Sequence, residues 1–135
     1  MQIQDLFSGA WVKDSGIPAQ VTGLTCDGNL ETTAYRYTNI KRVEPIKLSP
    51  RIMSMIGFEE KDCDGEPLWS FEYNQYLVTF MSPNGCPSLT IEDVSSKDSD
   101  HNVLVVKDEI YNLHELQRAF MVFDIPCDFK LPKPF

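Results

Sequence analysis

The sequence predicts an α+β fold in which a small N-terminal sheet, a short helix, an antiparallel sheet and a C-terminal helix follow one another. Three observations lead to this prediction. Apolar and polar residues alternate in several short segments, as they do in strands that bury one face. Apolar residues recur at helical spacing in two other segments. With 135 residues, 42% of them apolar and 24% charged, the chain resembles one ordinary globular domain, and we expect a single compact domain over 1–135.

Residues 1–45 are expected to form an SH3-like small β-barrel or sheet. Short segments that alternate or are rich in β-branched and aromatic residues predict its strands: Ala10–Val12, Ile17–Val21, Thr32–Tyr37 and Ile40–Val43. The Asp27-Gly28 pair marks a tight turn, because glycine adopts a positive φ at no steric cost. Several short strands in so few residues favour a strongly bent sheet.

Residues 46–58 are expected to hold a short connecting helix. Ser49 can cap its N-terminus, and Pro50 suits the first helical position, where the missing N–H costs nothing. Gly57 stands where a left-handed C-terminal cap belongs.

Residues 66–107 are expected to form antiparallel strands, and an acidic loop, 59–66, precedes them. The strands are predicted by alternation at 69–73, 76–80, 89–91 and 103–106. Glu60, Asp62, Asp64 and Gly65 repeat the start of a calcium-binding EF-hand loop. Because position twelve of that loop is Phe71 and not a glutamate, a solvated turn is the favoured interpretation, and a weak cation site is the alternative.

The last element is a helix at 112–124, followed by an extended tail at 125–135. Asn112 and Glu115 have the spacing of a capping box. One apolar stripe predicts the buried face of the helix: Leu113, Leu116, Phe120 and Phe123, widened by Ala119 and Val122.

Charge is divided unevenly along the chain. Residues 1–57 carry six basic and five acidic side chains, whereas 58–135 carry six basic and fifteen acidic ones, for a net charge of −8. An acidic surface repels phosphate, so nucleic-acid binding by the whole surface is disfavoured. Two groups of polar residues make up a candidate interaction surface: the basic stretch Arg36, Lys41, Arg42, Lys47 and Arg51, and the cluster His114, Glu115 and Arg118 on the last helix.

The four cysteines stand far apart, at positions 26, 63, 86 and 127, with no Cys-x-x-Cys pair. Because the N-terminus has no apolar signal segment, we expect reduced thiols and a cytoplasmic protein. No phosphate loop, nucleophile elbow or paired-histidine motif is found, so we expect a protein that is not an enzyme and holds no cofactor or metal. No apolar run reaches the length of a membrane span. Aromatic residues between Trp69 and Phe80 are expected to form core rather than a stacking platform for bases.

Two segments resemble a group of small uncharacterised proteins from gut Bacteroidales genomes and their prophages or mobile elements. The segment from Pro45 to Phe58, PIKLSPRIMSMIGF, resembles the group's P-I-x-L-[ST] segment that ends in Gly-Phe. The segment from Leu113 to Phe120, LHELQRAF, resembles its closing H-[QE]-L-Q helix. The resemblance implies a fold and a genomic setting, and no activity.

The absence of a convergent catalytic set predicts a non-enzymatic protein-interaction module of a bacterial mobile or phage-derived element, whose partner is another protein. The alternative is a role directed at nucleic acids. In that alternative, residues 36–51 dock on phosphate, or the acidic C-terminal half mimics DNA.

Overall fold

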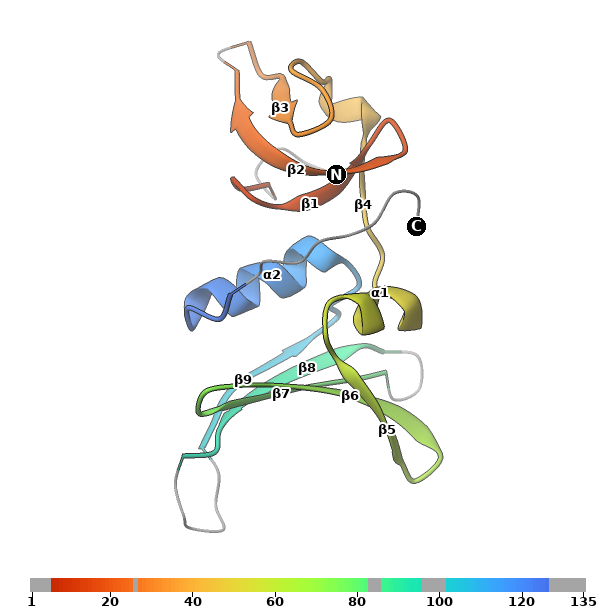
Figure 1. The fold of residues 1–135 in the computed structure, drawn as a ribbon, viewed down its shortest axis with the longest axis vertical. Coiled ribbons are helices and arrows are strands. Elements are labelled where there is room, and N and C mark those ends of the chain that lie inside the picture. The colour runs from red at the N-terminus through yellow and green to blue at the C-terminus, as the bar shows by residue number, and fades with distance from the viewer. Residues whose placement is uncertain (1–5, 26, 83–85, 96–101, 127–135) are drawn as a thin grey trace. The chain divides into compact units, whose positions relative to one another are not determined.

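The structure is a computed structural model that describes residues 6–25, 27–82, 86–95 and 102–126 (Figure 1). The chain divides into two compact units. Unit 1 comprises Met1–Leu48 and Asn112–Phe135, and unit 2 comprises Ser49–Tyr111. Each unit contains an antiparallel sheet and one helix, which confirms the predicted α+β class. The predicted tail at 125–135 lies, beyond Pro126, outside the described residues.

Unit 1 contains a four-stranded antiparallel sheet in the order β3-β2-β1-β4. Its strands are β1 (Trp11–Asp14), β2 (Ile17–Leu24), β3 (Leu30–Thr32) and β4 (Val43–Pro45). Ser15 and Gly16 join β1 to β2 with φ values of 52° and 83°, the two positive φ angles that a type I′ hairpin turn requires. The sheet is open, with β3 and β4 at its edges, so the barrel expected for residues 1–45 does not close.

The segment Thr32–Tyr37 is not the strand that its composition predicts. Strand β3 ends at Thr32, whose hydroxyl accepts hydrogen bonds from the amides of Ala34 and Tyr35 at 3.2 and 3.1 Å. Such local bonds offer the backbone an alternative to a strand ladder. The predicted strand at Ile40–Val43 is also replaced, by the 3-10 turn η2 (Ile40–Arg42), and β4 follows directly.

Helix α2 (Leu113–Val122) belongs to unit 1 and packs against β1, as Figure 1 shows. Leu113, Leu116 and Phe120 of the predicted stripe are fully buried, and Phe123 is half-buried. Val122 was expected to widen the stripe but is exposed. Asn112 is the N-cap residue, but the predicted capping box does not form. The Asn112 side chain donates to the Glu115 carboxylate at 2.8 Å and does not bond to the helix backbone.

Gln117 of α2 completes the backbone hydrogen bonding of β1. Strand β4 ends at Pro45, opposite Val12, so it does not reach the backbone of Gly9 and Trp11. There the Gln117 carboxamide takes the place of a strand: its Oε1 accepts from the Trp11 N–H at 2.8 Å, and its Nε2 donates to the Gly9 carbonyl at 3.0 Å. Buried backbone groups need such partners.

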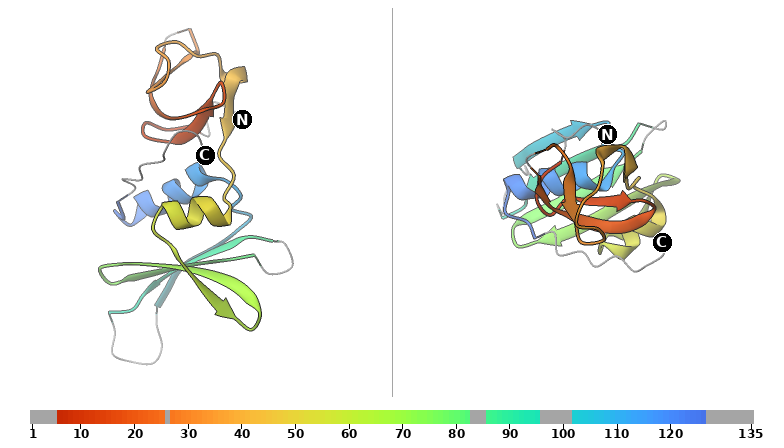
Figure 2. Two further views of the ribbon diagram at one scale, coloured as in Figure 1. Left: turned by 45° about the vertical axis from the view of Figure 1, so that its right-hand side comes forward. Right: turned by 90° about the horizontal axis from the view of Figure 1, so that it is seen from above.

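Unit 2 contains a five-stranded antiparallel sheet in the order β5-β6-β7-β8-β9, whose twist is visible in Figure 2. Its strands are β5 (Glu59–Cys63), β6 (Glu66–Tyr73), β7 (Tyr76–Met81), β8 (Ser88–Asp93) and β9 (Asn102–Asp108). The four strands predicted by alternation are confirmed. The prediction of an acidic loop at 59–66 is wrong. Residues 59–63 form strand β5, and a type I′ turn at Asp64 and Gly65 joins it to β6.

Helix α1 (Pro50–Met55) of unit 2 has the predicted ends. The Ser49 hydroxyl accepts from the Ile52 amide at 3.2 Å, and Pro50 occupies the first turn. Gly57 has a φ of 100°, and the chain then turns back so that the Phe58 amide reaches the Met53 carbonyl at 3.0 Å. Phe58 is buried.

Two of the aromatic residues between Trp69 and Phe80 belong to the core, as expected, and the other three, Phe71, Tyr73 and Tyr76, are half-buried. Trp69 pairs with Phe80 across the two strands, and both side chains are buried. Phe71, on the same face as Trp69, stacks on Phe58 at 5.4 Å between ring centroids. Neither helix in the described residues is long and apolar enough to cross a membrane.

Candidate interaction surfaces

Asp14 lies at the end of β1 with its side chain fully buried. Its Oδ2 accepts hydrogen bonds from the hydroxyls of Thr32 and Thr38, at 2.6 and 2.7 Å, and its Oδ1 accepts from Ser15 at 3.3 Å. A buried carboxylate is costly unless hydrogen bonds replace its water. These three hydroxyls supply that replacement and tie Asp14 to two segments far along the chain.

The two threonines bracket a short loop, residues 33–37, which we call the presented loop. At its start, the Thr32 amide donates to the Tyr35 carbonyl at 2.9 Å. At its end, Thr38 exchanges two backbone hydrogen bonds with Leu30, both at 2.8 Å. The amide of Thr33, the first residue of the loop, donates to the Gln20 carbonyl at 2.9 Å. The loop is therefore fixed at both ends to the sheet and to the buried carboxylate.

The presented loop exposes two aromatic side chains around a cation. Tyr35 and Tyr37 are 45% and 69% exposed, and Arg36 between them is also exposed. Exposed Lys41 and Arg42 follow on the η2 turn, which the Asn39 side chain caps by accepting from the Lys41 amide at 2.9 Å. No acidic residue stands between Glu31 and Glu44, so this segment combines aromatic rings with positive charge alone.

The basic residues that the sequence singled out fall into different units. Arg36, Lys41, Arg42 and Lys47 belong to unit 1 and are exposed. Arg51 is exposed on α1 and belongs to unit 2. Arg36, Lys41 and Arg42 lie within one continuous segment of seven residues, 36–42. Lys47 lies outside this segment and pairs through its backbone with Asn112.

The predicted cluster on α2 is divided by burial. His114 is buried, with 7% of its surface exposed, so little of it is open to a partner. Glu115 is half-buried and accepts from Asn112. Arg118 is exposed, and its guanidinium lies over the Phe7 ring at 5.5 Å from the centroid, a cation–π contact.

Sequence reasoning missed Asp14, Tyr35 and Tyr37 as parts of a site. Asp14 precedes Ser15-Gly16, where an aspartate usually belongs to an exposed turn, so its burial had no local signal. The two tyrosines alternate as strand residues do, which hid the loop. The one available signal was the absence of acidic residues from 32–43.

The two edges of the sheet in unit 2 differ in chemistry. The edge strand β5 carries four consecutive exposed charged residues, Glu59, Glu60, Lys61 and Asp62, on its two faces. The described side chains of β9 at the other edge include three exposed apolar ones: Val103, Leu104 and Val106 are 54%, 43% and 64% exposed. Unit 2 holds twelve acidic and four basic residues and so the entire net charge of −8, whereas unit 1 holds eight of each.

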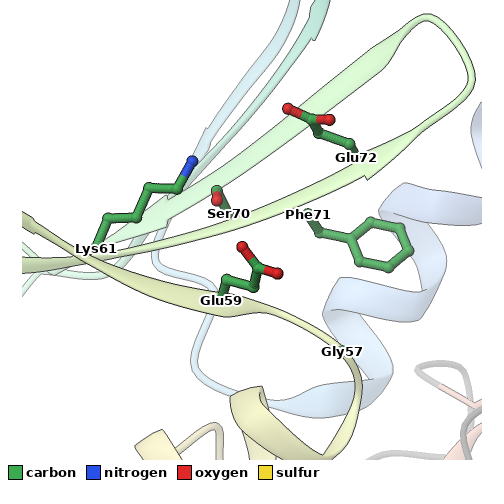
Figure 3. A pocket seen from close by; sticks show the side chains of 6 residues that line it. All are labelled: Gly57, Glu59, Lys61, Ser70, Phe71 and Glu72. Atoms are coloured by element: carbon green, nitrogen blue, oxygen red, sulfur yellow. The ribbon is translucent and has the colours of Figure 1, made fainter.

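A shallow pocket of about 280 Å³ lies at β5 and β6 (Figure 3). In Figure 3 the side chains of Glu59, Lys61 and Glu72 surround the hydroxyl of Ser70, and Phe71 points away from them. The residues that line the pocket include no histidine. Within the described residues, no three His, Cys, Asp or Glu side chains converge as a metal site requires.

Two carboxyl groups, one exposed and one half-buried, have lowered pKa values because of local hydrogen bonds. The Thr25 hydroxyl lowers the pKa of Asp27 below its usual value, and the Ser95 hydroxyl, 2.6 Å from Asp93, does the same for that carboxyl. Asp27 lies in a turn and Asp93 at the end of β8, and neither adjoins the presented loop in sequence. Cys86 is a free, exposed thiol, and the side chains of the other three cysteines lie outside the described residues.

Comparison of the chain with protein-family models, with curated proteins and with solved structures gave no match. The function must therefore be argued from the surfaces themselves.

Proposed function

We propose that the protein is a protein-interaction module that docks a partner on the presented loop of unit 1. The observation that carries the proposal is the exposure of Tyr35, Arg36 and Tyr37 on a loop whose ends are fixed to the fully buried Asp14. The resemblance to Bacteroidales and phage proteins supports the wider setting of the proposal, the cytoplasm of a bacterium and a mobile or phage-derived element.

The composition of the loop favours a protein partner. Tyrosine and arginine dominate the residues that contribute most to protein–protein binding, because each offers a large contact area together with hydrogen-bonding groups. A loop held by Thr32 and Thr38 loses little conformational entropy on binding, so more of the contact energy appears as affinity. The partner surface should be acidic, because Arg36, Lys41 and Arg42 have no acidic neighbour in the segment.

A photocrosslinking residue at position 37 tests the proposal in cells that produce the full chain. Benzoylphenylalanine keeps an aromatic ring at Tyr37, and the same residue at Val122, which is 73% exposed on α2, is the matched control. We expect one protein adduct at position 37 and none at position 122. The adduct should survive nuclease treatment, and Arg36→Glu should reduce it at least tenfold.

Two outcomes would overturn the proposal. An adduct that contains nucleic acid and disappears on nuclease treatment would assign the basic segment to phosphate docking instead. Equal adducts at positions 37 and 122, or adducts that Arg36→Glu leaves unchanged, would show contact by collision rather than docking on the loop.

A further inference from the structure

Strand β9 is the edge of the five-stranded sheet in unit 2. Its inner side pairs with β8 from Ser88↔Asp108 to Asp93↔Asn102, with a register shift at Ile91 and Glu92. In the part of the chain that the structure describes, no strand pairs with its outer side. An edge strand displays a row of backbone N–H and C=O groups that another extended chain can complete.

The two edge strands of this sheet differ in the exposed charged side chains that they carry. Folded proteins protect exposed edges with charged side chains, and β5 has four of them in a row, Glu59 to Asp62. In β9 the charges are confined to its end, at Lys107 and Asp108, and exposed Val103 and Val106 precede them. The protection of one edge and not the other indicates that β9 is kept open for pairing.

The acidic residues near β9 indicate what kind of strand could bind at this edge. Glu92 and Asp93 lie opposite the start of β9, and exposed Asp108 and Glu109 stand at its end. A second copy of this chain would bring a second unit of charge −8 against the first, which repulsion disfavours. A strand with basic side chains is attracted to the same surface, and apolar side chains in alternation with them would cover Val106.

We propose that β9 binds an extended segment of a partner protein, with alternating apolar and basic side chains, as a sixth strand of the sheet. The segment would pair with the regular stretch of β9 after the register shift, from Val105 to Asp108. This inference concerns unit 2 and does not depend on the presented loop of unit 1.

A capped decapeptide of alternating valine and lysine is the probe, titrated into the full chain at 150 mM salt. We expect saturable binding and at least tenfold slower exchange of the Val106 and Asp108 amides, which alternate with the amides that face β8, as that of Glu109 does; exchange in β5 should be unchanged. Two matched peptides separate pairing from attraction. The first replaces lysine with glutamate and should not bind. The second keeps every lysine but has a central proline, which removes a backbone donor, and should bind at least tenfold more weakly.

Variants of the chain locate the site. Val106→Lys places a cation on the edge and should weaken binding at least tenfold. Gln75→Lys is the control, because it adds the same charge at an exposed turn of unit 2. Equal weakening by both variants, or tight binding of the proline peptide, would overturn the proposal in favour of general charge attraction. A dimer in sedimentation equilibrium that Val106→Lys abolishes would overturn it in favour of a second copy.

Discussion

Among the described acidic side chains, Asp14 is the one without any exposed surface, and two hydroxyls depend on it. We expect Asp14→Ala to lower the free energy of unfolding by about 2–4 kcal/mol, because it removes the acceptor of the buried Thr38 hydroxyl and leaves that of Thr32 only the Tyr35 carbonyl at 3.5 Å. Urea unfolding measures this change, and amide exchange at Tyr35 and Thr38 should accelerate. Glu44→Ala, an exposed acidic residue of β4, should have little effect. Equal stability of the two variants would contradict the role given to Asp14.

A second prediction at this scale concerns Asp93, whose pKa the Ser95 hydroxyl lowers. A carboxyl group with a lowered pKa in the folded state stabilises the fold above its unfolded pKa, and this contribution disappears as the pH falls through the folded pKa. We expect the Asp93 carboxyl carbon to titrate at a lower pH than that of an uncapped surface aspartate in an NMR titration. Ser95→Ala should raise that midpoint. An unchanged midpoint would remove Ser95 as the cause.

The sequence indicated the elements whose signals are local. Helix α1 was predicted to its ends because Ser49, Pro50 and Gly57 act on adjacent backbone groups. Strands β6 to β8 were predicted because one face of each is buried. Strand β5 was missed because its exposed edge carries charged residues that are typical of a loop.

The candidate site depends on contacts that no local pattern encodes. The bonds from Asp14 to Thr32 and Thr38 span 18 and 24 residues, and the bonds of Gln117 to β1 span more than 100. Arg36 of the presented loop and Lys41 and Arg42 of the η2 turn could be named from the sequence. The exposure of Tyr35 and Tyr37 could not be predicted, because it depends on β3 ending at Thr32.

At the scale of elements, the junction of α2 with β1 makes a sharp prediction. Gln117→Ala should lower the free energy of unfolding by about 1–3 kcal/mol, because it removes the acceptor of the buried Trp11 N–H, whereas the Gly9 carbonyl still accepts from the Gln20 side chain at 3.1 Å. Gln117→Glu keeps the acceptor for Trp11 and loses the donor to Gly9. Amide exchange at Trp11 should therefore accelerate in the alanine variant and much less in the glutamate variant. Equal acceleration in both would contradict this division of roles.

The end of α1 gives a second prediction of this kind. Gly57→Ala should cost about 1–2 kcal/mol, because an L-residue at a φ of 100° is strained although its Cβ would meet the Phe71 ring at an acceptable 3.6 Å. Gly23→Ala is the control, since that glycine has no positive φ and open space around its Cβ. Thermal unfolding of both variants should show a lower midpoint for the first alone.

For the whole molecule, the concentration of the net charge of −8 in unit 2 predicts a dependence on salt. Like charges within one unit repel, and salt screens them beyond about 10 Å at 0.1 M. The thermal midpoint should therefore rise between 20 and about 300 mM sodium chloride. Glu60→Lys on the edge strand β5 should raise the thermal midpoint at low salt and make the midpoint depend less on salt. A midpoint that falls with salt would contradict it.

The division of unit 1 between the two ends of the chain has a consequence during synthesis. Residues 49–111, which form unit 2, leave the ribosome as one uninterrupted stretch after Leu48. At a translation rate of roughly 5–20 residues per second, Gln117 follows Leu48 by roughly 3–14 seconds. Until then the Trp11 N–H at the start of β1 lacks its partner, and it is in this interval that a chaperone or a foreign strand can engage the nascent chain.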